Sequence, residues 1–421
     1  TLSKPNVSLA GPPYLHFDAE GIWNFLLQGL AKLAGMAKIT DIVPVAHGAA
    51  CALVDADGGL ALPLLDYEQP IENDGYEQVK APFQETFTPK MANGLAFGRQ
   101  VYWQSKAFPD GFARTKYILG YPQYWSFRLT GQAATEVTAI GCHSGLWRPV
   151  EGTFSSFTEG MGWVPLFAPM RRASEVLGPL LPEIRGRTGL PEDCRVRVGI
   201  HDSNASFLRH RMARAIPFAV ASTGTWVVCM AAGVDPRGMP ENRGCLANVD
   251  ALGSPVATCN FMGGREFAEQ TRDLDGCLTT LESAAEVVER GSFLVPPLNQ
   301  GGGPFIGAPI GGPAGARTES GEQAVARASL YLALMTDYCF DLIKARGPVI
   351  VEGSLTGNQT YLQALATLRK EGVLVSSDTT GTVSGAALLA DVKIADEPEP
   401  VEPLDLPLAG YRKRWREALP A

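Results

Sequence analysis

Hydrophobic residues at helical spacing mark the first regular element of the chain. Asp18 has the side chain of a helix N-cap, and Glu20 lies in the first turn, where the helix dipole favours negative charge. The apolar positions that follow recur every three or four residues and form one face: Ile22, Phe25, Leu26, Leu30 and Leu33. The pattern therefore predicts an amphipathic helix that begins near Asp18.

Short apolar runs separated by turn residues predict strands after this helix. Residues 42–46 form one such run, which ends at His47-Gly48. Residues 50–54 and 60–64 flank the turn sequence Asp-Ala-Asp-Gly-Gly and predict a hairpin. Helix and strands in this order indicate an α/β arrangement.

The middle of the chain contains many Gly and Pro breaks. Helices are predicted over residues 122–130 and 170–186. A largely apolar strand over residues 196–200 then leads directly into His201-Asp202 and a further helix. Next, the turn 222–225 separates two apolar runs, which predicts a second hairpin.

The C-terminal part has the clearest alternation. A helix over 330–344 precedes a strand over 348–352, a Gly-bearing loop over 353–358, a helix over 361–370 with Thr360 as its cap, and a strand over 373–376. Strand, loop, helix and strand in this order predict a crossover between parallel strands.

A length of 421 residues exceeds the usual size of one hydrophobic core, so we expect two domains. The charged, Pro-bearing stretch 211–217 suggests the boundary, which divides the chain into residues 1–214 and 215–421. Hydrophobic content of 45% and charged content of 19% are ordinary for a soluble globular protein. The chain is therefore expected to be a two-domain protein of enzyme size.

Charge and cysteine usage narrow the function classes. The net charge of −8 argues against a nucleic-acid partner. No apolar stretch approaches the roughly 18–20 residues that span a bilayer, and residues 1–5 do not resemble a secretory signal, so no membrane partner is expected. The eight cysteines form no C-x-x-C pair, which favours buried thiols in a reducing, cytoplasmic compartment.

Asp202 is the first candidate for chemistry. It follows a predicted strand, and ligand crevices in open α/β sheets lie outside such strand ends. It can act as a general base or simply cap the following helix, and the sequence leaves both interpretations open. His201 is more often structural than catalytic, and five histidines suggest no metal site.

Two Gly-bearing loops are candidates for binding a nucleotide. The turn Ser222-Thr223-Gly224-Thr225 combines backbone donors with hydroxyl groups, which suits a phosphate, although an ordinary hairpin turn has the same features. The loop 353–358 allows a flat ring to approach the backbone, but it also fits a plain connection. Residues 301–303 are interpreted as a loop, and neither a Walker nor a Rossmann motif occurs.

The order of these pieces resembles that of the FGGY carbohydrate kinases, of the actin-like ATPase superfamily, over nearly the whole chain. The resemblance is closest to the branch of the rhamnulose and fuculose kinases. The segments that carry it are Gly199-Ile-His-Asp202, Ser222-Thr-Gly-Thr-Trp226, His47-Gly48, the L-T-G turn ending at Gly131 with Glu136-Val-Thr138 after it, Gly263-Gly264, the loop 353–358, and Thr379-Thr-Gly381 through Ala387.

The resemblance implies two actin-like (RNase H-like) α/β domains that flank a deep catalytic cleft. The first domain would bind a small sugar such as L-fuculose or L-rhamnulose, or a polyol. The second domain would bind ATP with Mg²⁺. A homodimer is a candidate assembly. Asp202 would be the general base. The implied sugar contacts are His47, Gly48, Gln123, Glu136 and His201, and the implied nucleotide contacts are Ser222, Thr223, Gly224, Thr225, Gly353, Ser354 and Asn358.

Two departures from the family pattern matter. The family opens with a D-x-G-T hairpin whose Asp helps to hold the metal, and the printed sequence lacks it, with residues 1–4 as a candidate remnant. Ser354 replaces the second Gly of the usual Gly-Gly pair, which would narrow the adenine slot. A catalytically silent sugar- or partner-binding relative and an actin-like ATPase that is not a kinase therefore remain alternatives.

Overall fold

The computed structural model describes residues 1–420 apart from 275–278, 316–319, 379 and 396. The chain forms two compact units, and each is described by itself. Unit 1 comprises Thr1–His210, Ala247–Ser254 and Thr380–Ile394. Unit 2 comprises Arg211–Leu246, Pro255–Thr379 and Ala395–Ala421. Two short later segments thus return to unit 1 after the chain has entered unit 2.

The predicted first helix is α1 (Ala19–Ala34), and Asp18 caps it by accepting the backbone N–H of Gly21 at 2.8 Å. The predicted face is confirmed in part, because Ile22, Leu26 and Leu30 are partly buried and pack against the core. Ala19, Trp23 and Leu27 are the buried positions, whereas Leu33 is 42% exposed. Trp23 packs on Trp125 with ring centroids 6.3 Å apart, so the largest side chain of the helix sets which face is turned to the core.

Unit 1 contains two parallel pairs of short strands. β10 (Arg195–Arg197) lies between β3 (Asp41–Ile42), to which it is parallel, and β9 (Val176–Pro179), to which it is antiparallel. β11 (Ile200–His201) pairs in parallel with β4 (Val45–Ala46). The carboxyl ends of β4 and β11 therefore lie side by side.

One local prediction for unit 1 is wrong and another is confirmed only in part. Residues 170–186 are not one helix, because Val176, Gly178 and Pro179 of β9 pair with β10, and only α9 (Pro182–Thr188) is helical. The proline at 179 opposes a continuous helix through this segment. The predicted hairpin forms only near its turn, where Val54 and Leu60 make an antiparallel bridge and Ala61 donates its N–H to the Leu53 carbonyl, while β5 (Cys51–Val54) pairs along its length with β6 (Tyr117–Gly120).

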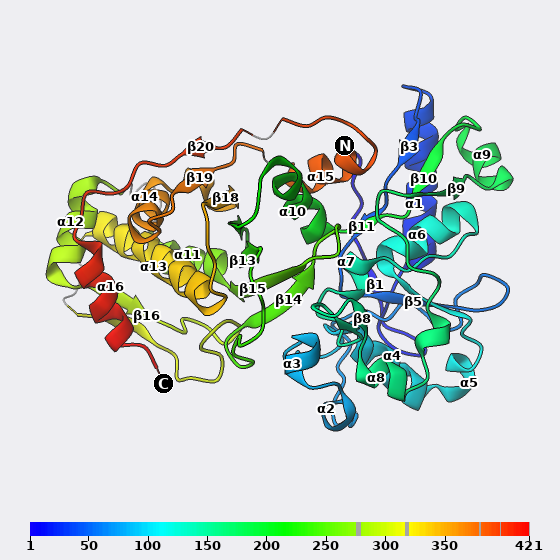
Figure 1. Cartoon of the computed structure of the whole chain (residues 1–421), viewed down its shortest axis with the longest axis horizontal. Coiled ribbons are helices and arrows are strands. Elements are labelled where there is room, and N and C mark those ends of the chain that lie inside the picture. Colours follow the sequence, from blue (N-terminus) through cyan, green and yellow to red (C-terminus); the bar gives the residue numbers. More distant parts are fainter. Residues whose placement is uncertain (275–278, 316–319, 379, 396, 421) are drawn as a thin grey trace. The chain divides into compact units, whose positions relative to one another are not determined.

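Unit 2 is built on a seven-stranded sheet with the order β14-β15-β13-β12-β18-β19-β20 (Figure 1). The predicted second hairpin is β12 (Phe218–Thr223) with β13 (Val227–Ala232). The predicted crossover is also confirmed: β18 (Val349–Gly353) and β19 (Val373–Val375) are parallel, and α14 (Gln359–Leu368) connects them. Its cap is Asn358 rather than Thr360.

The other elements complete the two units. Unit 1 also has β1 (Ser8–Leu9), β2 (His16–Phe17), α2 (Tyr76–Val79), α3 (Phe83–Thr86), α4 (Phe97–Ala107), α5 (Pro109–Phe112), α6 (Tyr121–Thr130), α7 (Val137–Ile140), β7 (Trp147–Arg148), β8 (Thr153–Phe154), α8 (Ser156–Gly160) and α15 (Gly381–Leu389). α10 (Asp202–Ala213) and β14 (Cys245–Val249) each span a boundary between the units. Unit 2 has β15 (Pro255–Phe261), α11 (Gly263–Thr271), α12 (Leu281–Arg290), β16 (Phe293–Val295), β17 (Gly312–Ala314), α13 (Gly321–Leu342), β20 (Glu399–Pro400) and α16 (Leu408–Glu417).

α15 packs closely on the helix that begins at Asp202. A Cβ atom on Gly385 would lie 1.6 Å from the carbonyl oxygen of Ala205 in α10, so only glycine allows this approach. This is the predicted C-terminal Gly-Ala-Ala helix, although Thr379 at its start lies outside the described residues. None of the described helices is both long and apolar enough to cross a membrane.

Candidate active site

The parallel pair β4 and β11 brings together two of the predicted site segments. In the register Ala46 is opposite His201, so His47 and Gly48 follow one strand where Asp202 follows the other. A Cβ on Gly48 would lie 2.9 Å from His201 Nε2 and 3.2 Å from Cys142 Sγ. Gly48 therefore lets the chain pass directly over the His201 ring.

Asp202 is the first residue of α10, and its side chain is 44% exposed. Its Oδ1 accepts the backbone N–H of Ser203 at 2.6 Å and the Ser203 hydroxyl at 3.3 Å, and lies 3.1 Å from His201 Nε2. Its Oδ2 has no hydrogen-bond partner among the described residues. The carboxylate thus combines a local contact at the helix start with one oxygen that is available to a ligand.

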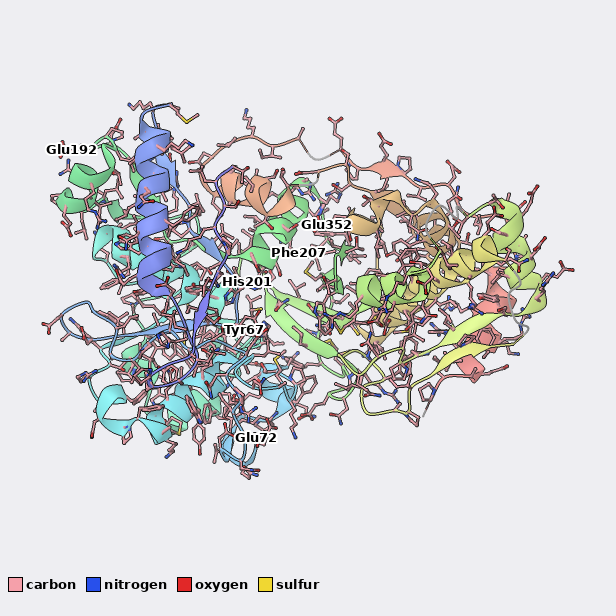
Figure 2. All side chains as sticks on the ribbon, turned by 180° about the vertical axis from the view of Figure 1, so that it is seen from behind. Tyr67, Glu72, Glu192, His201, Phe207 and Glu352 are labelled. Carbon is pink, nitrogen blue, oxygen red and sulfur yellow. The ribbon has the colours of Figure 1, made fainter. Side chains whose placement is uncertain are left out.

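His201 is buried, and its polar atoms are engaged within the chain. Burial lowers the pKa of the imidazole, while the neighbouring Asp202 opposes this, so the ring is neutral at pH 7. Its backbone N–H donates to Thr138 Oγ1 at 3.0 Å, and Asn204 Nδ2 lies 3.1 Å from its Nδ1. His201 is marked in Figure 2.

His47 lies among aromatic rings that the sequence did not single out. The ring centroids of Phe17, Tyr67 and Tyr121 lie 5.7, 5.6 and 5.0 Å from that of His47. Phe17 and Tyr121 are stacked, with an interplanar angle of 13°. These three residues come from separate segments of the chain, so no local motif could have identified them; Tyr67 is marked in Figure 2.

The electrostatic neighbours of His47 are carboxylates. Burial lowers the pKa of His47, whereas Asp202 and the buried Asp66 act to raise it. The Nδ1 atom of His47 is buried and has no hydrogen-bond partner among the described residues. A neutral ring with an unpaired nitrogen is suited to a hydrogen bond from, or to, a ligand hydroxyl.

Gln123 and Glu136, the weaker predicted sugar contacts, support the backbone around this site. Gln123 Nε2 donates to the carbonyl of Gly199 at 3.1 Å, in the turn before β11. Glu136 Oε2 caps α7 by accepting the N–H of Thr138 at 3.0 Å, and accepts the Thr138 hydroxyl at 2.5 Å. Thr138 in turn accepts the backbone N–H of His201, so Glu136 fixes the strand end indirectly. Their roles toward a sugar stay predictions.

Glu136→Gln is expected to change how stability depends on pH. Burial raises the pKa of Glu136 from 4.5 to about 7, so the folded state holds a proton that the unfolded state has lost between these values. Stability contributed by the protonated form is complete below pH 4.5 and is lost as pH rises toward about 7. The variant keeps a capping oxygen without the charge, so its stability relative to wild type should rise over this window by on the order of 3 kcal/mol. Urea denaturation at pH 5 and pH 8 measures this difference, and an equal effect at both values would contradict it.

In unit 2 the predicted phosphate turn and the predicted adenosine loop are neighbours. β12 and β18 are parallel, with Ser222 opposite Glu352 and Thr223 opposite Gly353. The Thr223 hydroxyl donates to the Glu352 carbonyl at 2.6 Å and accepts the N–H of Leu355 at 3.0 Å. Thr223 therefore joins the two segments.

Glycines allow three backbone segments to meet at this point of unit 2. A Cβ on Gly353, which has φ of +93°, would lie 2.0 Å from the Thr223 carbonyl oxygen. A Cβ on Gly264, at the start of α11, would lie 1.9 Å from the Gly224 carbonyl oxygen. The loop at residues 301–303 joins them, since a Cβ on Gly302 would lie 2.7 Å from the Trp226 ring.

The predicted nucleotide contacts differ in what their side chains do. The hydroxyls of Ser222 and Thr225 have no hydrogen-bond partner among the described residues. Ser354 is exposed, and its hydroxyl lies 3.4 Å from the Thr223 carbonyl oxygen. Asn358 is engaged at both ends, since its Oδ1 accepts the Tyr361 N–H at 3.0 Å and its Nδ2 donates to Ser329 Oγ at 2.9 Å. Gly224 donates its N–H to the Trp226 carbonyl within the turn.

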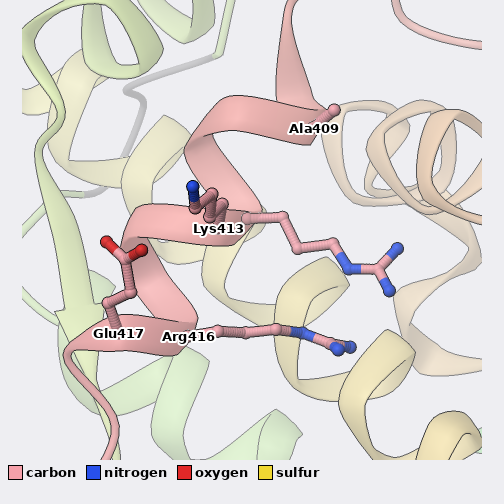
Figure 3. A pocket seen from close by; sticks show the side chains of 5 residues that line it. Ala409, Lys413, Arg416 and Glu417 are labelled. Atoms are coloured by element: carbon pink, nitrogen blue, oxygen red, sulfur yellow. The ribbon is translucent and has the colours of Figure 1, made fainter.

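A separate pocket of about 430 Å³ lies on one face of α16 (Figure 3). It is lined by Ala409, Arg412, Lys413, Arg416 and Glu417. Arg412 and Arg416 each lie 3.1 Å from Oδ2 of the buried Asp337 in α13. The pocket contains none of the predicted site residues, and its arginines serve to attach α16 to α13.

The comparisons with known proteins bear on the whole chain. The family profile described as the C-terminal domain of the FGGY carbohydrate kinases matches residues 215–399. A carbohydrate kinase from Novosphingobium aromaticivorans is 37% identical, with a TM-score of 0.90 over 98% of this chain and 91% of that chain. The chain belongs to the FGGY carbohydrate kinases.

More distant FGGY kinases share the fold. Xylulose kinase from Rhodospirillum rubrum is 17% identical with a TM-score of 0.78, and the match covers 98% of this chain and 91% of that one. Glycerol kinase from Plasmodium falciparum, solved with ADP, is 14% identical with a TM-score of 0.74, covering 99% and 92%. No curated protein matches the chain.

Membership of the family confirms the predicted class of fold, with two actin-like domains, and the predicted class of enzyme, a carbohydrate kinase. The predicted branch of the rhamnulose and fuculose kinases is not specified by these matches and stays a prediction. Among the described residues, no group of three or more His, Cys, Asp or Glu side chains is arranged to hold a metal ion.

Proposed function

We propose that this kinase transfers the γ-phosphoryl group of ATP to a hydroxyl of a small neutral sugar, with Asp202 as the general base. The sugar is a ketose or deoxyketose such as L-fuculose or L-rhamnulose, or a polyol. The observation that carries the proposal is the free Oδ2 of Asp202 at the shared end of β4 and β11. In this assignment unit 1 binds the sugar and unit 2 binds the nucleotide.

The residues of unit 1 support binding and deprotonation of a hydroxyl. Oδ2 of Asp202 accepts the proton as the hydroxyl oxygen attacks phosphorus, and ADP leaves. The rings of Phe17, Tyr67 and Tyr121 offer an apolar surface to the C–H face or methyl group of a sugar. His47 provides a hydrogen-bonding nitrogen beside them.

The neighbouring charges favour a neutral substrate. The ionisable groups that act on His47 are the carboxylates of Asp202 and Asp66 and the ring of His201, whose pKa is lowered by burial so that it is neutral at pH 7. A sugar acid placed there would be repelled by both carboxylates, whereas a neutral polyhydroxyl compound would not. The proposal therefore prefers ketoses and polyols over sugar acids.

ATP, when bound, supplies the phosphoryl group that is transferred. The residues of unit 2 fit such a ligand, because glycines allow three backbone segments to meet there, and the hydroxyls of Ser222 and Thr225 have no hydrogen-bond partner among the described residues. We assign the phosphates to Ser222, Thr223, Gly224 and Thr225, and the adenosine to Gly353, Ser354 and Asn358. Mg²⁺ is proposed only as the companion of the ATP phosphates, since the described residues form no metal site of their own.

A sugar panel with coupled detection of ADP tests the proposal. Ketoses, deoxyketoses, polyols and sugar acids are each supplied with MgATP, and at least one neutral compound should release ADP in proportion to sugar phosphate. Thermal shift on the same panel reports binding, since about 100 times Kd adds about 2.7 kcal/mol of stability. Sugar binding without turnover would indicate a catalytically inactive, sugar-binding member of the family. ADP release without sugar phosphate would indicate an ATPase that is not a kinase.

Ser222→Ala is expected to weaken nucleotide binding more than it slows the chemical step. The variant removes one hydroxyl among several donors to the phosphates, and a hydrogen bond to a charged group contributes about 1.5–3 kcal/mol. KM for ATP should therefore rise by about 10- to 100-fold, while KM for the sugar stays within about 2-fold and serves as the internal control. An unchanged KM for ATP would remove Ser222 from the nucleotide site.

A further inference from the structure

His201, Asp202 and Asn204 form a compact group of contacting side chains at the start of α10. His201 Nε2 lies 3.1 Å from Asp202 Oδ1, and His201 Nδ1 lies 3.1 Å from Asn204 Nδ2. His201 and Asn204 are 4% and 3% exposed, so water does not replace these contacts. The imidazole thus lies between the carboxylate and the amide.

Two independent contacts determine which ring nitrogen carries the proton. A neutral imidazole has one N–H, and the amide nitrogen of Asn204 can only donate, so Nδ1 is the acceptor and Nε2 carries hydrogen. The carboxylate of Asp202 can only accept, and its Oδ1 lies 3.1 Å from Nε2, so this contact also favours hydrogen on Nε2; Cys142 Sγ, 3.7 Å from Nε2, is the hydrogen-bond neighbour of the same atom. Rotating the Asn204 amide would not remove this second contact.

We infer that Asn204 is a positioning residue, which acts through His201 to hold Oδ1 of Asp202 and leave Oδ2 as the atom that takes the proton from the sugar. The inference rests on the proposed function of Asp202. It also reassigns His201, because Nε2 lies against Asp202 Oδ1 and Cys142 Sγ and Nδ1 accepts from Asn204, which leaves neither ring nitrogen for a sugar hydroxyl.

The arrangement has a direct consequence for the carboxylate. Oδ1 accepts from the Ser203 backbone and the Ser203 hydroxyl and lies 3.1 Å from Nε2 of the His201 ring, so this oxygen is turned toward the protein. Oδ2 has no such partner among the described residues, and a proton therefore adds there. Two hydrogen bonds and the contact with the His201 ring on one oxygen also limit rotation of the carboxylate about its terminal bond, which keeps Oδ2 at one position.

Nitrogen-15 NMR of histidine-labelled full-length protein reads the tautomer directly. The wild-type His201 ring should carry hydrogen on Nε2, with the resonance assigned by its loss in His201→Gln. Asn204→Asp presents only acceptors to Nδ1, so hydrogen should move to Nδ1 or the ring should become doubly protonated. The groups that face the ring are Asp202, Cys142, His47 and His143, and all are unchanged in this variant. Hydrogen on Nδ1 in the wild type would overturn the inference.

Steady-state kinetics test the positioning role. Asn204→Leu removes the amide but keeps Asp202, so kcat should fall by about 10- to 100-fold, less than the roughly 10⁴-fold seen when a catalytic tautomer is lost outright. Both KM values should change by no more than about 3-fold, because Asn204 is only 3% exposed and is not a proposed contact of either substrate. An unchanged kcat in a folded Asn204→Leu or Asn204→Asp protein would overturn the inference.

Conservative replacements of His201 separate positioning from packing. The amide nitrogen of Gln reaches the place of Nε2, whereas that of Asn reaches only the place of Nδ1. His201→Gln should therefore keep kcat within about 5-fold of wild type, and His201→Asn should lose as much as Asn204→Leu. Equal losses in both variants would indicate that the ring acts only by packing and would count against the inference.

Asp202→Asn, measured in parallel, distinguishes failure of the inference from failure of the proposed function. Loss of kcat in Asp202→Asn with full activity in the Asn204 variants overturns only the positioning role. Full activity in Asp202→Asn overturns the assignment of the base, and with it the role of Asn204, while the tautomer measurement still reports the hydrogen bonds themselves.

Discussion

Asp202→Asn is expected to lower kcat by about 10²–10⁴-fold while leaving the melting temperature almost unchanged. The side chains are nearly isosteric, and the amide oxygen can keep the contacts that Oδ1 makes with Ser203 and His201. The amide nitrogen takes the place of Oδ2 and cannot accept a proton from a hydroxyl. The variant therefore loses the basic atom and keeps the local structure.

The measurements are kcat on the sugar identified by the panel, KM for both substrates, and thermal denaturation. Asp193→Asn is a matched control, because Asp193 is exposed and its ion-pair partner among the described residues is Lys38, on the surface of unit 1. Turnover by Asp202→Asn within a few-fold of wild type would make Asp202 a structural residue at the start of α10. The base would then have to be another group, or the reaction would not use one.

Much of the fold could be predicted because the apolar runs along the sequence correspond to the strands and helices that pack in the structure. The crossover from β18 through α14 to β19 is predicted by apolar runs that alternate with a loop containing Gly353 and Gly357. The structure has the same order of strand, helix and strand. The segment 170–186 fails for the opposite reason. Val176 and Leu177 fit a helix or a strand, and pairing with β10 decides between them. A residue distant in sequence supplies that information.

In the candidate site, too, some residues could be predicted from their local sequence and others depend on the packing of distant segments. In unit 1, His47 and Asp202 follow strands that pair in parallel, so the two residues lie close together. In unit 2, the turn 222–225 and the loop 353–358 lie at the ends of another parallel pair and are neighbours for the same reason. The rings of Phe17, Tyr67 and Tyr121 come together only through the packing of separate segments around His47. Asn358 was predicted for nucleotide binding, and its role as the cap of α14 depends on geometry that its residue type alone does not reveal.

Gly353→Ala is expected to cause the second large effect, on both stability and nucleotide binding. Gly353 has φ of +93° and ψ of −153°, a region open essentially only to glycine, and forcing another residue into it costs about 1–3 kcal/mol. The added Cβ would also lie 2.0 Å from the Thr223 carbonyl oxygen, so β18 must move away from β12. Because Thr223 bonds to the Glu352 carbonyl and to Leu355, that movement displaces the turn proposed to hold the phosphates.

The matched control for this prediction lies in the same loop. A Cβ on Gly357 would meet no atom within 4 Å, so Gly357→Ala adds the same methyl group without a clash. Gly353→Ala should lower the melting temperature by several degrees, at roughly 2–4 °C per kcal/mol for a large domain, and raise KM for ATP at least about 10-fold. Gly357→Ala should change neither by much. If the two variants behaved alike, the close approach of Gly353 to Thr223 would not be what aligns the two segments, and the assignment of the nucleotide to this part of unit 2 would lose its structural basis.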